Sequence, residues 1–371
     1  MTGWTSWARA QLDQVRASGQ WRAPRTFDAR GAVGTLDGRE VVSFASNDYL
    51  GLSAHPAVVA AAHDALDRWG AGSGAARLIV GSRPPHDALE ADLARWKRTD
   101  AAVVFPTGFA ANLGVLSTFA GPGTLVLSDE LNHASIIDGC RLARADIDVF
   151  PHTDVDHVVK ALRAHRGPAL VVTDTIFSMD GDAAPVDALA AACAEHDALL
   201  VLDEAHAVLG PDPILEGVDA LRVGTLSKTL GSLGGFVATS NPFAELLVNR
   251  ARSYIFTTAS PPAVAAAAGA ALRVLQSPEG HALRRRLRHT IDRLRPGHPS
   301  PIVPIVLGDE RVALAAAGAL LERGLLVPAI RPPTVAPGTC RLRVALSAAH
   351  TPEQVDALLA GLDECVPGWR G

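Results

Sequence analysis

Short apolar segments of strand length alternate with helical patterns through the middle of this chain, and this alternation constrains its fold more than any other feature. Helical stretches such as Phe109–Phe119, Val155–His165 and Val186–His196 separate most of the apolar segments. Strands that are apolar along their whole length are typical of parallel sheets covered by helices on both faces. We therefore predict an α/β fold with a mostly parallel central sheet. The predicted strands are Ala101–Phe105, Thr124–Leu127, Ile147–Phe150, Ala169–Thr173, Ala198–Leu202, Leu221–Val223 and Gly235–Thr239.

The pattern changes toward both ends of the chain. We expect residues 1–42 to form a separate lead-in, with a helical start and a hairpin signal at Asp37-Gly38. Residues 43–276 hold the large sheet domain, which opens with predicted helices over 55–69 and 84–98. From residue 277, a very basic helix, proline-rich links and the strand-like segments Pro304–Leu307 and Cys340–Leu346 predict a smaller α+β domain over 277–371.

Composition excludes several classes of partner. The 371 residues carry a formal net charge of -5, so neither nucleic acid nor an anionic membrane is an expected partner. The N-terminus lacks the apolar core of a signal peptide, and the apolar stretch Pro261–Leu272 is too short to cross a bilayer. The four cysteines lack the spacing of a zinc site or a disulfide framework. We expect a cytoplasmic protein with reduced thiols and no metal.

Polar residues follow five of the predicted strands. In an open parallel sheet, ligands bind at the carboxyl ends of the strands, where the following loops and helix N-termini converge. Residues in these positions therefore share one edge of the sheet, and this convergence predicts the functional site. They are Thr107 and Gly108, then His133, then Ser178, then Asp203 and His206, and finally Thr225 and Lys228.

Lys228 lies in a loop of glycines and small hydroxylated residues, Gly224–Gly235. A P-loop is excluded because no glycine immediately precedes the lysine. For such a segment on its own, an exposed lysine in a glycine-rich loop is the default interpretation. The chemical alternative is an amine nucleophile that forms an imine with an aldehyde.

Asp203 ends a wholly apolar strand upstream of Lys228. A carboxylate in this position needs a cationic partner, because an unpaired buried charge is strongly disfavoured. A pyridinium nitrogen is such a partner, and keeping that nitrogen protonated makes pyridoxal phosphate an electron sink. The alternatives are a carboxylate that caps the next helix and a metal site shared with Glu204 and His206. The metal site ranks low because no second cluster completes the shell.

His133 and the helix start at Gly108 complete the candidate site. An imidazole can stack on a pyridine ring, although a structural role is the commoner fate of a lone histidine. Backbone N–H groups near Gly108 and Phe109 open a predicted helix, and such groups bind phosphate. Further hydroxyls for that phosphate come from Thr225, Thr257 and Thr258.

Taken together, these motifs resemble the α-oxoamine synthases, which are fold-type I pyridoxal-phosphate enzymes that condense an amino acid with an acyl thioester. No single segment is specific for this family, but the set is, and it runs nearly the whole length of the chain. The matching segments are Ser46–Gly51, Gly70–Gly74, Thr107–Asn112, His133–Ser135, Phe177–Asp182, Asp203–His206 and Thr225–Lys228.

The resemblance implies a role for each matching residue. Lys228 would carry pyridoxal 5'-phosphate as a Schiff base, Asp203 would face the ring nitrogen, His206 would contact the ring hydroxyl, and His133 would stack on the ring. The amino-acid carboxylate would go to Asn47 and Arg343, and the acyl substrate to Arg22 and Thr334. The remaining cofactor contacts would be Gly108, Phe109, Ser178 and Thr225, with Thr257 and Thr258 reaching the phosphate of a neighbouring subunit in a homodimer.

Within the family, Ile330–Val335 and Gly338–Arg343 look most like the branch that joins L-alanine to a pimeloyl thioester in biotin synthesis. The thiol carrier in that branch would be CoA or acyl carrier protein. Two departures concern the loops near the acyl channel. Residues 208–217, after an unusual Ala207, and residues 295–301 are shorter than the family usually has.

Two other functions remain as alternatives. A family member that uses glycine and acetyl-CoA would keep the same cofactor and the same lysine. A catalytically silent nucleotide-binding protein would use the glycine loops differently, but no Gly-x-Gly-x-x-Gly opens the first βα unit.

Overall fold

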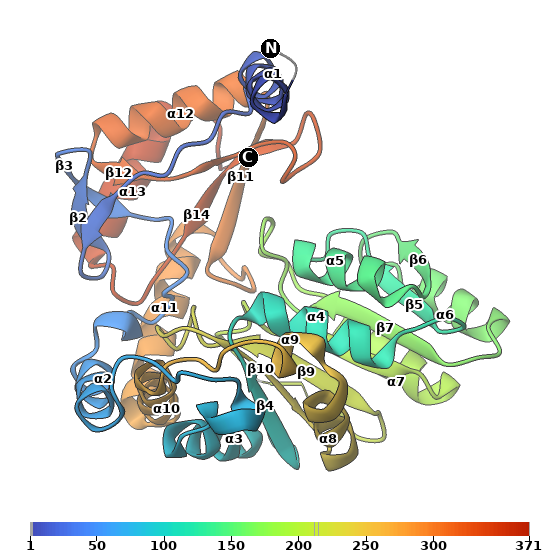
Figure 1. Cartoon of the computed structure of the whole chain (residues 1–371). Coiled ribbons are helices and arrows are strands. Elements are labelled where there is room, and N and C mark those ends of the chain that lie inside the picture. The colour runs from blue at the N-terminus through green and yellow to red at the C-terminus, as the bar shows by residue number, and fades with distance from the viewer. Residues whose placement is uncertain (1–2, 211, 214, 371) are drawn as a thin grey trace.

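A computed structural model describes residues 3–210, 212–213 and 215–370. Its centre is a seven-stranded sheet in the order β4-β10-β9-β8-β7-β5-β6 (Figure 1). Strands β5 to β9 pair in parallel, whereas β10 runs antiparallel to both of its neighbours. The predicted mostly parallel sheet is therefore confirmed. Its strands are β4 (Ala101–Phe105), β5 (Leu125–Asp129), β6 (Asp146–Phe150), β7 (Ala169–Asp174), β8 (Leu199–Asp203), β9 (Ala220–Thr225) and β10 (Gly235–Thr239).

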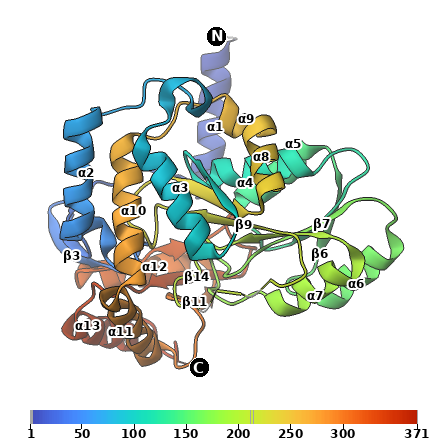
Figure 2. The same cartoon turned by 90° about the horizontal axis from the view of Figure 1, so that it is seen from below.

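Helices cover both faces of this sheet, as the apolar strands require. Buried side chains of α4, α5, α8 and α9 pack on one face, and those of α6 and α7 pack on the other. Figure 2 shows the strands between these two layers. The bounds of these helices are α4 (Gly108–Phe119), α5 (Ala134–Ala143), α6 (Val155–Ala164), α7 (Val186–His196), α8 (Asn241–Arg250) and α9 (Arg252–Ile255).

A third group of helices joins the large sheet to the rest of the molecule. Helix α10 packs against α2 and α3, and the three share a core with the C-terminal strands. Both α2 and α3 begin with proline, whose missing N–H costs nothing in a first turn. The bounds are α2 (Pro56–Trp69), α3 (Pro84–Lys97), α10 (Pro262–Gln276) and the basic α11 (Pro278–Leu294), with short turns η1 (Leu52–Ala54) and η2 (Arg77–Gly81).

Two smaller sheets lie beside the large one in Figure 1. The first combines both ends of the chain, because β3 pairs in parallel with β12. Asp37 and Gly38 form the turn between β2 and β3, and both residues have positive φ. The division of the chain into domains after residues 42 and 276 stays a prediction. The elements are α1 (Trp4–Ala17), β1 (Phe27–Ala29), β2 (Val33–Leu36), β3 (Arg39–Ser43), β11 (Ile302–Gly308), α12 (Glu310–Glu322), β12 (Leu325–Leu326), β13 (Ala329–Ile330), β14 (Cys340–Ala345) and α13 (Pro352–Cys365).

Among the described residues, no helix combines the length and the apolar character that a membrane crossing would need.

Candidate functional site

The predicted site residues of the large domain gather at the carboxyl edge of the sheet. The strand register brings them there, because Asp174 at the end of β7 pairs with Asp203 at the end of β8, and Asp203 pairs with Val223 on β9. Lys228 follows β9 within a few residues. Both carboxylates and the lysine therefore reach the same point without any unusual backbone geometry.

Lys228 is a partly buried amine with a histidine beside it. Its Nζ lies 2.9 Å from Nε2 of His206. Burial lowers the pKa of Lys228, and the charge of Arg343 acts in the same direction, while Asp203 and Asp174 oppose them. Burial also holds the pKa of His206 well below its usual value, so that this imidazole is neutral at neutral pH. A neutral amine is the form that acts as a nucleophile or base.

Asp203 is oriented by two hydrogen bonds. Its Oδ1 accepts from the backbone N–H of Ala205 at 2.9 Å, and its Oδ2 accepts from Nδ2 of Asn112 at 2.7 Å. Asn112 lies on α4 with 1% exposure and also donates to the Ser135 hydroxyl. The carboxylate is 5% exposed, so it is held in place for a cationic partner.

His133 precedes α5, and its ring lies near Asp203 and Lys228, whose charges act on its pKa. Its backbone N–H donates to Oδ2 of Asp174 at 2.8 Å, and its Nδ1 lies 2.7 Å from the Ser135 hydroxyl. Although the residue is exposed, desolvation by the surrounding protein lowers its pKa. Burial and the charge of Asp203 raise the pKa of Asp174 well above its usual value. A neutral, open imidazole fits the predicted stacking role.

The start of α4 and the loop after β9 form a close-fitting cradle. A Cβ at Gly108 would lie 3.4 Å from Cβ of Thr225, and a Cβ at Gly235 would lie 2.5 Å from the Thr107 carbonyl oxygen. The Thr107 side chain accepts from the Ala110 N–H, and the earlier N–H groups of the helix have no intrahelical partner. These N–H groups and the Thr225 hydroxyl fit a phosphate.

Arg343 on β14 enters the site from the smaller C-terminal sheet. Its Nε donates to the Ser178 carbonyl oxygen at 2.6 Å, and its Nη2 donates to Oδ1 of Asn47 at 3.2 Å. The residue is 6% exposed. Asn47 and Arg343, the two residues predicted to receive the amino-acid carboxylate, are thus in contact, and Ser178, predicted to hold the cofactor, contacts Arg343 through its backbone carbonyl. Their roles stay predictions.

Arg22 and Thr334 line a different cavity of about 570 Å³ between the N-terminal segment and β13. Its walls combine apolar side chains such as Leu326 and Ile330 with the basic Arg25 and Arg331. In the described part of the chain, no hydrogen bond connects Arg22 or Thr334 to Lys228. They remain predicted acyl-substrate residues.

Thr257 and Thr258 follow α9, and no described hydrogen bond joins either hydroxyl to the other predicted site residues. They lie next to an apolar surface that we call the η2 patch, formed by Leu78, Ile79, Val80 and Phe256 with exposures of 49%, 74%, 64% and 70%. The first three residues lie in η2, and Phe256 follows α9, which packs against η2. That these hydroxyls reach a neighbouring subunit stays a prediction.

The sequence analysis missed several residues that hold the site together. Tyr49 and Asn112 lie inside segments that match the family. The resemblance therefore marked these segments but did not identify the two side chains. Asp174 ends a buried strand, as Asp203 does, and the same reasoning could have found it. Asp212, in the shortened stretch 208–217, pairs with Lys97 at 2.9 Å and with Arg222 at 3.1 Å. Residues 211 and 214 of that stretch lie outside the described residues.

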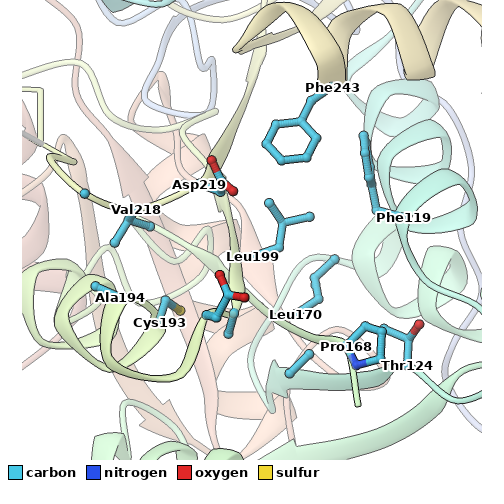
Figure 3. A pocket seen from close by; sticks show the side chains of 14 residues that line it. Phe119, Thr124, Pro168, Leu170, Cys193, Ala194, Leu199, Val218, Asp219 and Phe243 are labelled. Atoms are coloured by element: carbon cyan, nitrogen blue, oxygen red, sulfur yellow. The ribbon is translucent and has the colours of Figure 1, made fainter.

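The opposite edge of the sheet also has a cavity, of about 500 Å³ (Figure 3). The starts of β7 and β8 line it, together with Phe119, Phe243 and Asp219. None of the predicted site residues lies there. Across the described ranges, no group of three or more His, Cys, Asp or Glu side chains is arranged to hold a metal ion.

Comparison with known proteins gives consistent matches. The aminotransferase class I and II family matches residues 39–362. The 8-amino-7-oxononanoate synthase of Anaeromyxobacter dehalogenans is 49% identical, over 98% of this chain and 96% of that protein. A serine palmitoyltransferase from S. paucimobilis with bound PLP-myriocin has a TM-score of 0.89 and 32% identity, over 98% of this chain and 97% of that one. The 8-amino-7-oxononanoate synthase of Francisella tularensis has a TM-score of 0.73 and 28% identity, over 87% of this chain and 97% of that one.

Proposed function

Because the chain belongs to the aminotransferase class I and II family, and within it to the α-oxoamine synthases, we propose that it condenses L-alanine with a pimeloyl thioester. The products would be 8-amino-7-oxononanoate, CO2 and the free thiol, a step of biotin synthesis. The observation that carries the proposal is the meeting of three groups at one sheet edge. They are the amine of Lys228, the buried carboxylate of Asp203 and the guanidinium of Arg343.

The residues present fit pyridoxal 5'-phosphate. The cradle at Gly108 and Thr225 would hold the phosphate, Asp203 would face the ring nitrogen, and His133 and His206 would line the ring. When bound through Lys228, the cofactor supplies an electron sink that stabilises negative charge at the carbon next to the amino group. Asn112 keeps the Asp203 carboxylate in position for this interaction.

Lys228 is the group that moves a proton in this site. Burial lowers the pKa of its amine, so that the free amine is neutral at a lower pH than that of an exposed lysine. It can therefore remove the proton from the α-carbon of alanine. His133, with its open ring, can donate a hydrogen bond to negative charge that develops on the thioester oxygen.

Arg343 and Asn47 orient the amino acid. A planar guanidinium binds a carboxylate through two parallel hydrogen bonds, and Arg343 is held by Ser178 and Asn47 so that it points into the site. For the acyl substrate we propose the cavity with Arg22 and Thr334. Its mixture of apolar wall and basic side chains suits an acyl chain that ends in a carboxylate.

We further propose a homodimer in the cytoplasm. The η2 patch is apolar and exposed, which is typical of a surface that a partner covers. A second copy bound there would bring Thr257 and Thr258 to the phosphate cradle of the neighbouring site. All four cysteines are free thiols, which suits a reducing compartment.

Absorbance and product analysis test the proposal. The purified holoenzyme should show the visible band of bound pyridoxal phosphate, L-alanine should perturb this band, and pimeloyl-CoA should then release CoA and form 8-amino-7-oxononanoate. Pimeloyl-acyl carrier protein in parallel identifies the thiol carrier. A protein that ignores alanine but converts glycine and acetyl-CoA would refute the substrate assignment, and one that never binds the cofactor would refute the whole proposal.

A further inference from the structure

Asn47 and Arg343 form the proposed carboxylate subsite, but they belong to segments that are far apart in the chain. Oδ1 of Asn47 accepts a hydrogen bond from the Tyr49 hydroxyl at 3.0 Å and one from Nη2 of Arg343 at 3.2 Å. Both lone pairs of this oxygen are therefore used, which leaves the Nδ2 hydrogens for a substrate carboxylate. Because one carboxylate must meet both residues, its binding depends on how firmly the two segments are held together.

The loop that carries Asn47 is joined by hydrogen bonds to the chain that follows β14. The N–H of Ala345 donates to the Phe44 carbonyl oxygen at 2.8 Å, and the N–H of Ala348 donates to the Tyr49 carbonyl oxygen at 2.8 Å. These two bonds lie on either side of Asn47 in the chain. They bring the start and the end of its loop to the same short segment after β14.

His350 closes this junction with its side chain. Its ring is 2% exposed and packs on Phe44, with 4.3 Å between the ring centroids. Its Nδ1 accepts from the Ser347 N–H at 3.0 Å, and its Nε2 lies 3.0 Å from the Ser43 carbonyl oxygen. A backbone N–H only donates and a carbonyl oxygen only accepts, so the ring is neutral with its proton on Nε2. Burial lowers the pKa of His350, in agreement with this neutral form.

Ser347 adds a second side-chain contact at the same junction. Its hydroxyl donates to the Asp48 carbonyl oxygen at 2.7 Å and accepts from the Ala349 N–H at 3.2 Å. Asp48 is the chain neighbour of Asn47. The serine therefore holds the loop beside Asn47, while His350 holds it at the end of β3.

We propose that His350 is a positioning residue for the amino-acid subsite, because it fixes the spacing between Asn47 and Arg343. This inference rests on the proposed function, in which those two residues receive the carboxylate of alanine. The ring acts through the loop, since both of its nitrogens bond to backbone groups. Without these bonds, the Ser43 carbonyl oxygen and the Ser347 N–H would lose their partner in a buried position, and the two segments would shift to satisfy them.

Binding of L-alanine to the holoenzyme, followed through the change of its visible band, tests the inference. His350→Phe keeps a ring beside Phe44 but removes both hydrogen bonds, and it should weaken alanine binding by roughly fivefold, which corresponds to about one hydrogen bond. KM for alanine should rise by a similar factor, while KM for the pimeloyl thioester should stay within about twofold. Ethylamine, which is alanine without its carboxylate, should perturb the band of the wild type and of the variant at the same concentration.

Two milder variants extend the test. His350→Gln keeps a donor for the Ser43 carbonyl oxygen, so it should bind alanine more tightly than His350→Phe does. Ser347→Ala leaves the His350 ring in place and removes only the hydroxyl contacts, so it should weaken alanine binding by a smaller factor. If His350→Phe does not fold, these two variants decide the question, and wild-type alanine affinity in both would overturn the inference.

His86 provides the matched control, because it is 0% exposed and makes the same pair of contacts in another part of the molecule. Its Nδ1 accepts from the Arg83 N–H at 3.0 Å, and its Nε2 lies 2.8 Å from the Ser260 carbonyl oxygen. His86→Phe should therefore leave alanine binding unchanged.

Three results would overturn the inference and leave the proposed function intact. They are unchanged alanine binding in His350→Phe, an equal loss in His86→Phe, and an equal loss of ethylamine binding in His350→Phe. A wild-type holoenzyme whose band does not respond to alanine would instead refute the proposed function, and this inference with it.

Discussion

Lys228 and Arg343 each combine burial with a fixed neighbour. The Lys228 amine faces His206, and the Arg343 guanidinium is held by Ser178 and Asn47. Fixed side chains lose little freedom when a ligand binds, and correct placement of a reacting group accounts for a large share of catalysis. Variants at these two positions should therefore affect different kinetic steps.

Lys228→Ala should abolish turnover, with a loss of about 10³-fold or more, because both the covalent attachment of the cofactor and the proton acceptor are removed. The visible spectrum should lose its sensitivity to borohydride, since no imine to the protein can form. Lys160 is exposed on α6, and Lys160→Ala should behave as wild type. Turnover in Lys228→Ala close to the wild-type rate would contradict the assignment.

Arg343→Lys should raise KM for alanine by roughly tenfold or more, because a lysine cannot form the paired hydrogen bonds of a guanidinium with a carboxylate. KM for the pimeloyl thioester should stay within about twofold. Steady-state kinetics with each substrate varied in turn measures both values. Arg341, on the same strand but paired with Asp180, is the matched control. A rise in KM for the thioester alone would place Arg343 in the acyl subsite instead.

His152 connects elements that are distant in the sequence. It follows β6, its Nδ1 lies 3.0 Å from Oδ1 of Asp129 at the end of β5, and its Nε2 lies 2.7 Å from Oδ2 of Asp182. Asp182 closes the loop that carries Ser178, the contact of Arg343. Burial alone would lower the pKa of His152, but the hydrogen bonds to Asp129 and Asp182 outweigh it and raise the pKa. When protonated, the ring holds this loop to the sheet through both carboxylates.

The stabilisation by His152 should depend on pH. Because its pKa is raised on folding, the contribution is fully present below the unfolded value of ~6.5 and is lost as the pH rises through the folded value. His152→Gln should lower Tm by roughly 1–3 °C at pH 6 and by less at pH 9. Thermal unfolding at both pH values, with His63→Gln at an exposed position on α2 as control, measures this. A larger decrease in Tm at pH 9 than at pH 6 would contradict stabilisation by the protonated His152 ring.

The whole molecule presents an exposed apolar surface at the η2 patch. The η2 patch lies next to Thr257 and Thr258, which have no described hydrogen bond to the site of their own chain. A monomer would leave this surface in water and would leave the two hydroxyls without their predicted function. A dimer explains both features at once.

Ile79→Asp should shift the protein from dimer to monomer, because a charge would be buried in an apolar interface. Activity should fall with assembly, since each site would lose the hydroxyls of its neighbour. Sedimentation or light scattering at several concentrations measures the assembly state. Val149 is exposed on the edge strand β6, and Val149→Asp should leave the dimer intact. A wild-type protein that is monomeric, or an active monomeric variant, would reject the shared site.

The sequence by itself determined the sheet and one side of the site. Apolar runs and glycine loops are local signals, and because parallel strands end at one edge, they place Asp203, His206 and Lys228 together before any coordinates are known. The tertiary structure decided the rest. Asn47 and Arg343 meet across 296 positions, and Tyr49 meets His206 across 157. Such contacts arise from the packing of β14 and the N-terminal segment against the large sheet, which leaves no local pattern in the chain, so only the fold reveals that Tyr49 lies beside the histidine that contacts Lys228.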